Sequence, residues 1–481
     1  MKKINGKPGC YSLLLLLSLQ VYSLKTFSQN ETSRIFNEAS RGLLSLSCKD
    51  LLMDSLANSQ TRPGPGINPD IIPFIEKLVE ESRLRDPKLL PDKFKRHDSV
   101  EKFVRGFPGL TISLMNRRFA TELRFLPEGF AQKGFVVGDP HDGNFRFRFL
   151  FHPENSRKDR FDYGLKDFDE AGLGILSLDF SRYLVYLLAT HDQFKKFDRQ
   201  FLDQVIDSYL KGLSLDDSPN LPSLLQEQTQ KNPEEVREKI KKYAKKRTDP
   251  RDLKFTSEVM KDELEKFRFR NLEQETVAPF RASNDRNVSE NEREQIKAQL
   301  LLEIKFALEN HFGPRNISIH DIAVSKRNSG GSAGLQRFWL SIQVRDSYGQ
   351  FFPMVVELKR NSERSGWTDT FRNSLTENSS ARYSFALNAA HFERGFAEEV
   401  VLIGGLDYLL RIKGAPDLKL SDAEVPKMIL YNSYLLGRIH GSQGSKISIP
   451  YLESVKSNLE NYREFIKDMS LRVFHEIRKA D

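Results

Sequence analysis

Cysteine is nearly absent from this chain of 481 residues, which carries only Cys10 and Cys48. Two thiols exclude a disulfide scaffold and a cysteine-rich zinc site. Long apolar runs are lacking after Ser28, where no stretch reaches the roughly 18 apolar residues that a membrane helix needs. The mature chain is therefore expected to be soluble and to have no transmembrane span. Sequence repeats and low-complexity tracts are missing too, which excludes a repeat array.

Excess charge is also small, since the 74 lysines and arginines exceed the 66 aspartates and glutamates by 8. This surplus is compatible with an anionic ligand, but over such a length it is too small to indicate nucleic-acid binding. Apolar residues are plentiful: 39% of the chain is hydrophobic, and 35 residues are phenylalanine. Such a chain can bury a large core, and its length predicts two or three domains at about 150 residues each.

The first 28 residues have the three parts of a secretory signal peptide: a lysine-rich start, a leucine-rich run over 11–24, and small residues at Thr26 and Ser28. We therefore expect a protein that is exported to the periplasm or secreted. The alternative is an uncleaved N-terminal anchor. After cleavage Cys48 would be the one cysteine left, so no internal disulfide is expected.

Composition shifts along the chain predict its domains. Residues 57–70 are rich in proline, glycine and asparagine and indicate a linker. From 317 onward, alternating apolar residues replace helical spacing. The predicted parts are the signal peptide 1–28, an N-terminal helical extension and linker 29–97, a helical lobe with the chemical motifs 98–316, a sheet-rich lobe 317–420, and C-terminal helices 421–481 that pack on the helical lobe.

Local patterns predict several individual elements. Asn232, Ser289 and Ser421 are each followed by residues typical of a helix start, and 214–232 has the composition of a loop. The helix from Ser421 is expected to run to His440. Strands are predicted, from alternation and from short apolar runs, at 134–137, 338–344, 352–358, 400–403 and 408–412. A helix is predicted at 178–189.

Basic residues crowd into 239–247, within the helix expected to begin at Asn232. A solvated helix face is the commonest role of such a cluster. The alternative is a contact surface for an anionic partner or a membrane.

Two acidic motifs follow apparent strands and carry the most specific chemistry. In Gly138-Asp139-Pro140-His141-Asp142-Gly143-Asn144, Asp139 and Asn144 can direct a carboxylate and a carboxamide oxygen into one site. Asp167-Phe168-Asp169-Glu170 supplies further hard oxygen ligands. Phosphoryl transfer needs such groups to orient or deprotonate an acceptor and to hold Mg²⁺. Each motif alone is more often an acidic turn, but together they favour a functional site.

A glycine-rich segment and a lysine strengthen this hypothesis. Ser329-Gly330-Gly331-Ser332-Ala333-Gly334 lies where one strand should turn into the next, and its backbone amides can approach phosphates. Lys359 lies near the end of a later strand, where it alternates with Val355 and Glu357 on one face. A lysine in that position can contact phosphate oxygens.

These motifs resemble those of aminoglycoside-phosphotransferase-type kinases and, more closely, of the bacterial family called domain of unknown function 2252. The likeness includes GDPHDGN, DFDE, Phe103-Val104-Arg105-Gly106, the glycine segment, Lys359, Tyr408-Leu409-Leu410-Arg411 and Leu436-Gly437-Arg438-Ile439-His440. It covers about 98–200 and 317–445. Ser329 replaces the family's first loop glycine, Arg360 replaces the glutamate after the lysine, and 230–310 has no matching motif.

The resemblance implies an α+β, protein-kinase-like fold. In such kinases the glycine loop and lysine precede the catalytic loop, whereas here they follow it by almost 200 residues. The helix that ends in LLGRIHG resembles the one leading into the catalytic loop, yet it lies near the end of the chain. A circular permutation would explain both facts. The alternative is an unrelated fold with coincidental motifs.

The resemblance also implies residue roles. Asp139 would be the catalytic aspartate with His141 orienting it, and Asn144, Asp167 and Asp169 would be the metal ligands. Gly331, Ser332, Gly334 and Lys359 would bind the phosphates of ATP, or of another nucleoside triphosphate, with Mg²⁺. Asp179 would either brace the catalytic loop through backbone N–H groups or serve as an acid at a helix N-terminus. Lys359 would pair with Glu393, Glu398 or Glu399.

Three functions are compatible with these residues. The first is an ATP- and Mg²⁺-dependent phosphotransferase with an unknown acceptor. The second is an exported kinase-like pseudoenzyme that acts as a binding module, an interpretation favoured by the scarcity of ATP outside the cytoplasm. The third is a metal-dependent phosphoesterase, because Asp139-Pro140-His141 resembles a metal-binding pair. No residue pattern identifies the acceptor.

Overall fold

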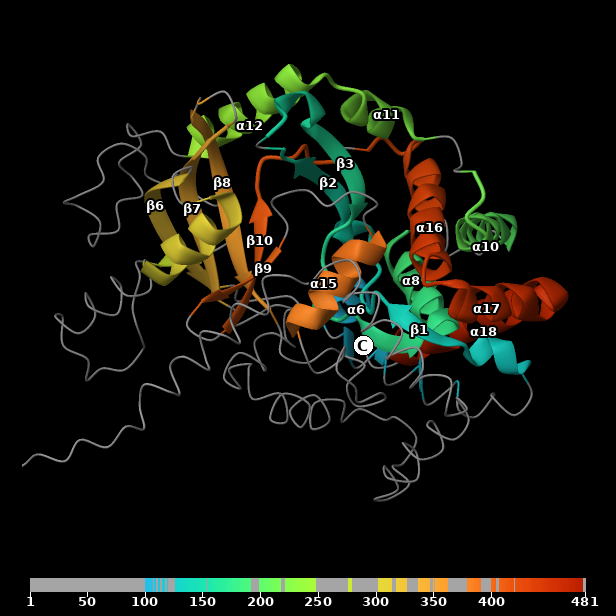
Figure 1. Ribbon diagram of the computed structural model, residues 1–481. Helices are drawn as coiled ribbons and strands as arrows, with labels where there is room; N and C mark the ends of the chain where they lie inside the picture. Colours follow the sequence, from blue (N-terminus) through green and yellow to red (C-terminus); the bar gives the residue numbers. More distant parts are fainter. Residues whose placement is uncertain are drawn as a thin grey trace, which may run out of the picture. The chain divides into compact units, whose positions relative to one another are not determined.

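The computed structural model describes most residues of 100–247 and 302–478 and, between these, only 276–278. All of them belong to one of the chain's two compact units, Leu51–Asp481. This unit contains a six-stranded antiparallel sheet of strand order β5-β6-β7-β8-β10-β9 (Figure 1). The strands are β5 (Thr276–Ala278), β6 (Ile317–Lys326), β7 (Gln336–Arg345), β8 (Phe351–Arg360), β9 (Glu399–Ile403) and β10 (Leu406–Ile412).

The alternating residues that predicted strands do form them. β7 and β8 pair as an antiparallel hairpin in which Trp339 lies opposite Glu357 and Arg337 lies opposite Lys359. β9 and β10 occupy the predicted 400–403 and 408–412. The sheet expected within 317–412 is therefore confirmed. β5 joins the same sheet from the segment expected to be part of the helical lobe.

The strands β7, β8 and β10 are largely buried on both faces, but the two faces differ in chemistry. On one face the side chains are apolar, as in the cross-strand series Phe338, Leu358 and Leu410. The other face carries ionisable groups that are just as buried: Arg337, Glu357, Lys359 and Arg411. Burying charge is unfavourable unless it is paired, so these groups on the second face are expected to have charged partners.

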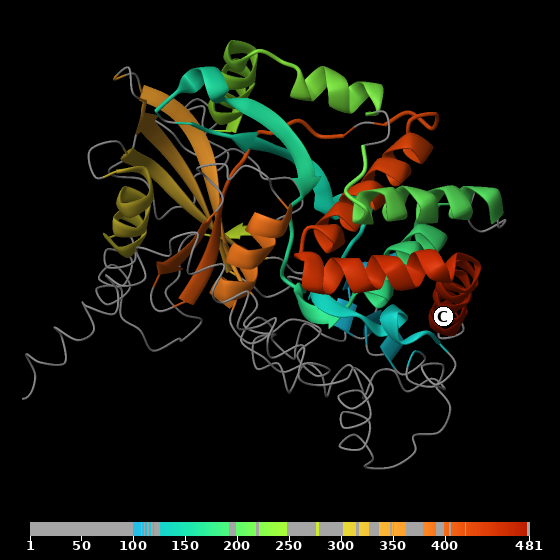
Figure 2. The same cartoon turned by 45° about the vertical axis from the view of Figure 1, so that its right-hand side comes forward.

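Two further ladders carry the acidic motifs. β1 (Lys133–Val136) pairs with β4 (Gly172–Ile175), and β2 (Phe145–Leu150) pairs with β3 (Arg160–Leu165). The β2–β3 hairpin is the long teal ribbon of Figure 2, and Phe151 of the segment after β2 stacks on Phe352 of β8 at 5.8 Å. The hairpin thereby connects the GDPHDGN and DFDE motifs to the six-stranded sheet.

Helices from both ends of the sequence pack together. α8 (Leu176–Thr190) packs against α6 (Val100–Gly106) and α18 (Leu459–Arg478), and α10 (Arg199–Leu213) packs against α16 (Val425–Gly441) and α17 (Ser445–Ser457). α8 includes the helix predicted at 178–189 and is almost entirely buried, as its apolar composition requires. Further helices among the described residues include α11 (Ser223–Thr229), α12 (Pro233–Arg247), α15 (Ser379–Ala390) and a helix at 302–312.

The predicted start of α12 is confirmed, whereas the loop predicted at 214–232 is partly wrong. Asn232 Oδ1 accepts the Glu235 N–H at 2.9 Å, and the Glu235 carboxylate accepts from the Asn232 amide at 2.8 Å. The first bond satisfies a backbone N–H that the first helical turn leaves unpaired, and the second links the side chains of the two residues. Within the supposed loop, α11 forms after Pro222, and its Leu225 is fully buried.

The predicted start of α16 at Ser421 is also wrong. The helix begins at Val425, and residues 422–424 form a turn in which the Glu424 N–H reaches the Ser421 carbonyl at 2.9 Å. Pro426 explains the shift, because proline lacks an N–H and is tolerated only in the first helical turn.

The architecture is therefore mixed α+β, with helices beside a curled antiparallel sheet. Among the helices that the structure describes, none has the length and apolar character needed to cross a membrane.

Candidate functional site

The segment Val137–Asp139 leaves β1 and is held in place by Asp179 of α8. The buried Asp179 carboxylate accepts the N–H groups of Val137 and Gly138, both at 2.8 Å, and lies 3.1 Å from His440 Nε2 of α16. Gly138 has φ +78°, and a Cβ there would come within 1.9 Å of the Glu170 carbonyl oxygen. Of the two roles expected for Asp179, the structure shows the brace.

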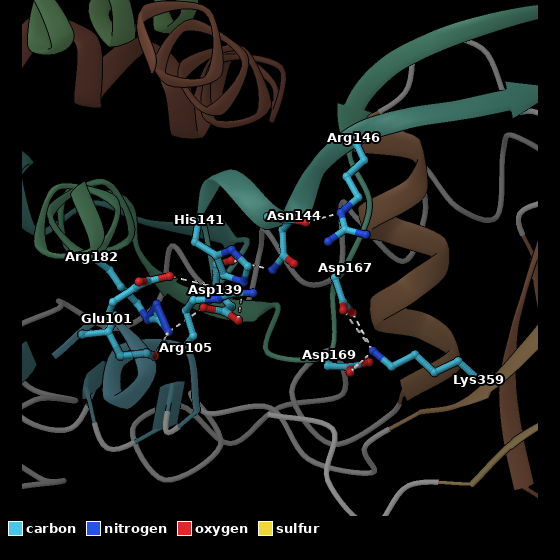
Figure 3. Close-up of polar contacts among 12 residues, drawn as sticks. Glu101, Arg105, Asp139, His141, Asn144, Arg146, Asp167, Asp169, Arg182 and Lys359 are labelled. Atoms are coloured by element: carbon cyan, nitrogen blue, oxygen red, sulfur yellow. Dashed lines mark hydrogen bonds and ion pairs between the residues drawn. The ribbon is translucent and has the colours of Figure 1, made fainter. Parts of the chain in front are cut away.

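Asp139 projects beyond this brace and contacts a buried arginine. Arg182 Nη2 lies 2.6 Å from Asp139 Oδ1, and the same nitrogen donates to the Val104 carbonyl of α6 at 3.1 Å (Figure 3). Burial, against the opposing effect of Arg182, raises the pKa of the Asp139 carboxyl to about 7. Asp139 can therefore exchange a proton near neutral pH.

Asn144 and His141 complete this loop. The Asn144 amide donates to the Asp139 carbonyl at 2.9 Å, which leaves its Oδ1 as an acceptor. His141 Nε2 lies 3.5 Å from Asp139 Oδ2. Burial lowers the pKa of the His141 imidazole well below its ordinary value, and the Arg105 and Arg182 guanidinium groups lower it further. His141 is therefore neutral at pH 7.

The DFDE motif meets Lys359, which is 192 residues away in sequence. Lys359 Nζ lies 2.8 and 3.1 Å from the two oxygens of Asp167, and it also contacts Asp169 (Figure 3). The Tyr383 hydroxyl of α15 donates to the other oxygen of Asp169. Burial alone would raise the pKa of Asp167, but the Lys359 ammonium and the Arg411 guanidinium outweigh it and hold that pKa below its ordinary value.

Glu357, two residues before Lys359, is the centre of a buried ion network. Arg337 Nη1 lies 2.9 Å from it, Arg411 Nε contacts it, and Lys413 Nζ lies 3.7 Å away. Burial acts to raise the pKa of Glu357, but these cations reverse the effect and hold it well below its ordinary value. The network keeps the strand bearing Lys359 in register with β7 and β10.

The glutamate expected to pair with Lys359 is not Glu399. That carboxylate is 59% exposed and lies 2.5 Å from His311 Nδ1. Glu393 and Glu398 lie outside the described residues, as do Gly331, Ser332 and Gly334. Among the described residues, the carboxylate partners of Lys359 are the two aspartates of the DFDE motif, beside which β8 ends.

A second network of hydrogen bonds holds the GDPHDGN loop through Asp142. Asp142 accepts from the Tyr183 hydroxyl at 3.1 Å and from the Asn432 amide at 3.0 Å, and its other oxygen lies 3.0 Å from His191 Nε2. Asn432 belongs to α16, 290 residues after Asp142, so sequence inspection missed this contact. The sequence did offer an indication for Arg182, because this residue follows Asp179 by three positions and so lies on the same face of α8.

The expected metal ligands fit Mg²⁺ in chemistry. Asp167 is ionised and 30% exposed, and Asn144 presents a free amide oxygen beside Asp139. In the part of the chain that the structure describes, no three His, Cys, Asp or Glu side chains gather as a metal site. Mg²⁺ usually takes only one or two carboxylates and completes its shell with phosphate oxygens and water. The residues therefore suit Mg²⁺ bound together with phosphates.

The basic cluster at 239–247 is only partly available to a partner. Lys239 Nζ donates to Gln228 at 2.6 Å and Lys241 Nζ to Glu238 at 2.8 Å, while Lys242 and Lys245 are exposed. The side chains of 246 and 247 lie outside the described residues. An anionic partner at this cluster remains a prediction.

Comparison with known proteins identifies a family. The sequence model of the family described as "Uncharacterized protein conserved in bacteria (DUF2252)" matches residues 85–383, which include the GDPHDGN motif, the DFDE motif and Lys359. No curated protein and no solved structure matches the chain. The match spans well over half of the 481 residues. The chain therefore belongs to the bacterial family named domain of unknown function 2252.

Proposed function

We propose that this protein is a phosphotransferase that uses ATP, or another nucleoside triphosphate, and Mg²⁺ on an acceptor not yet identified. The observation that carries the proposal is the contact of Lys359 with Asp167, at 2.8 Å, between a sheet strand and the DFDE motif. A lysine and an acidic metal ligand at this separation can bracket the phosphates of one nucleotide. Export of the protein stays part of the proposal.

The catalytic loop supports the same function. Asp139 lies at the end of β1, has a pKa of about 7, and is followed by Asn144 with a free amide oxygen. A carboxylate with that pKa can orient an acceptor hydroxyl and accept its proton. Asn144, Asp167 and Asp169 would hold Mg²⁺, which would neutralise phosphate charge. Lys359 would bind phosphate oxygens, and Arg182 would keep Asp139 in position.

The position of α16 supports a circularly permuted kinase-like fold. Just beyond this helix, Gln443 bonds to the backbone of Phe135 in both directions, at 2.6 and 2.5 Å. Phe135 belongs to β1, which leads into the catalytic loop. The end of α16 thus lies beside the strand that would follow it in an unpermuted chain. His440 on the same helix contacts Asp179, the brace of that loop.

A binding module without turnover is the second candidate. It is favoured by one contact: the Lys359 ammonium neutralises both carboxylates expected to hold the metal. Both functions predict nucleotide binding, but only the first predicts transfer to an acceptor. The phosphoesterase hypothesis is less well supported, because the described residues offer no cluster of three side chains for a protein-bound metal.

Replacement of Asp167 by asparagine should weaken Mg²⁺-dependent nucleotide binding by about tenfold or more, since it removes an anionic ligand of a hard cation. Calorimetric titration of ATP with and without Mg²⁺ measures this. Asp207→Asn is a suitable control, because Asp207 pairs with Arg463 at 2.5 Å on the helices and should leave binding unchanged. Equal binding by the wild type and Asp167→Asn would remove Asp167 from the metal site.

Turnover should depend on pH through Asp139. Its pKa is about 7, so the basic form is lost as pH falls. The rate at low substrate should fall about tenfold per pH unit below 7 and level off above it. A pH profile of nucleotide turnover, limited to the range where the fold is intact by circular dichroism, measures the inflection. A profile flat from pH 5 to 8 would contradict the assignment of Asp139 as base.

A further inference from the structure

Arg105 lies at the catalytic loop but has no part in the nucleotide site proposed above. It belongs to α6, and the preceding Val104 carbonyl accepts from Arg182 at 3.1 Å. Because that same Arg182 nitrogen contacts Asp139, α6 is tied to the catalytic aspartate. The Arg105 side chain is 44% exposed, and Nη1 lies 3.2 Å from Glu101. The helix α6 therefore holds the backbone of Arg105 close to Asp139.

Three polar groups face the space above Gly143. A Cβ on Gly143 would lie 3.4 Å from Arg105 Nη2 and 3.0 Å from His141 Nδ1, so both nitrogens border the volume that glycine leaves open. Arg146 Nε donates to the carbonyl of the same glycine at 2.5 Å, and Figure 3 shows this guanidinium beside Asn144. The two guanidinium groups are therefore at most about 9 Å apart.

His141 gives an independent sign of a ligand. The residue is only 6% exposed, and within the described part of the chain its buried Nδ1 has no hydrogen-bond partner. A buried polar atom without a partner costs about 1–3 kcal/mol, so such atoms usually meet a ligand or water. The neutral ring can accept a hydrogen bond at Nδ1 from a hydroxyl or, in its other tautomer, donate one to an anionic oxygen.

We propose that Arg105 and Arg146, with His141 between them, bind a phosphate group carried by the acceptor, so that the acceptor is a phosphorylated alcohol. This proposal rests on the phosphotransferase function. Guanidinium groups bind phosphate through paired, charge-assisted hydrogen bonds. Donors from three directions suit the several oxygens of a phosphate better than the two of a carboxylate. The acceptor hydroxyl would then lie beside Asp139.

Titration of the full-length protein with inorganic phosphate tests the proposal. Phosphate should bind the wild type, and Arg105→Gln and Arg146→Gln should each weaken it by about tenfold or more while leaving Mg²⁺–ATP affinity within a few-fold. Arg463→Gln is the matched control, because this arginine pairs with Asp207 away from the site and should change neither affinity. Acetate should bind about tenfold more weakly than phosphate.

Several results would overturn the proposal. They are absence of phosphate binding by the wild type, unchanged phosphate affinity in both arginine variants, and acetate binding as tight as phosphate. Two other results would show that the inorganic phosphate binds in the nucleotide site instead. One is loss of phosphate binding in Lys359→Met alone, and the other is weakened Mg²⁺–ATP binding in Arg105→Gln. If phosphate binding depends on the arginines but no nucleotide binds, the anion site stands and the phosphotransferase function fails.

Discussion

Asp139→Asn is expected to lower phosphoryl transfer by about 10²–10⁴-fold while leaving Mg²⁺-dependent nucleotide binding within a few-fold of the wild type. Asparagine keeps the size of the side chain and an acceptor for Arg182, whose Nη2 lies 2.6 Å from Asp139 Oδ1. It cannot accept a proton from an acceptor hydroxyl. In the proposed function Asp139 acts only as the reaction proceeds, so its replacement should affect turnover and leave ground-state binding almost unchanged.

The measurement is nucleotide turnover with a panel of acceptors beside calorimetric binding of Mg²⁺–ATP. The matched control is Asp162→Asn. Asp162 also pairs with an arginine, Arg148, but it belongs to β3 and its side chain is 38% exposed. That variant should keep both activities. Loss of nucleotide binding in Asp139→Asn, with transfer intact in Asp167→Asn, would reverse the roles of the two aspartates.

Glu357→Gln should destabilise the fold by about 3–5 kcal/mol. The Glu357 carboxylate is fully buried, and its replacement removes the nearest counter-charge of two guanidinium groups in the sheet, those of Arg337 and Arg411. An uncompensated buried charge cannot regain the solvation it gives up on folding. Urea unfolding followed by circular dichroism measures the free energy of unfolding.

An exposed carboxylate provides the comparison for this variant. Glu460 is 77% exposed and lies 2.9 Å from Arg463, so Glu460→Gln should change the free energy of unfolding by less than about 1 kcal/mol. Similar losses in both variants would show that burial of Glu357 does not govern its contribution. The ion network would then be an incidental feature of the sheet.

Sequence patterns predicted the parts of this fold that depend on local periodicity. The alternation in 338–344 and 352–358 predicted β7 and β8, and the apolar run at 178–189 predicted α8. The stretch Phe145–Leu150 also alternates, as Phe-Arg-Phe-Arg-Phe-Leu. It forms β2, in which all residues but Arg146 are buried. That strand was not predicted, although the same periodicity was present.

Contacts across the fold were harder to predict, because they depend on strand register and helix packing. The motifs singled out Asp139 and Asp167 as candidates, and the braced position of Asp179 was one of two expectations. In contrast, the contacts of Lys359 with Asp167 and Asp169 were not expected, because the sequence analysis considered only glutamates as its partners. Similarly, the contact of Asn432 with the catalytic loop joins segments 290 residues apart. Nothing in the local sequence around Lys359 or Asn432 indicates these partners.

The most direct test is titration of the purified full-length chain with ATP, with and without Mg²⁺, for the wild type and Lys359→Met. We expect ATP affinity to rise by about tenfold or more when Mg²⁺ is present, and to fall by about tenfold or more in the variant. The reason is that Lys359 Nζ and Asp167 Oδ1 lie 2.8 Å apart, so both side chains would contact the bound complex. Absence of Mg²⁺-dependent nucleotide binding by the wild type, or identical affinity in Lys359→Met, would contradict a nucleotide site between the sheet and the DFDE motif.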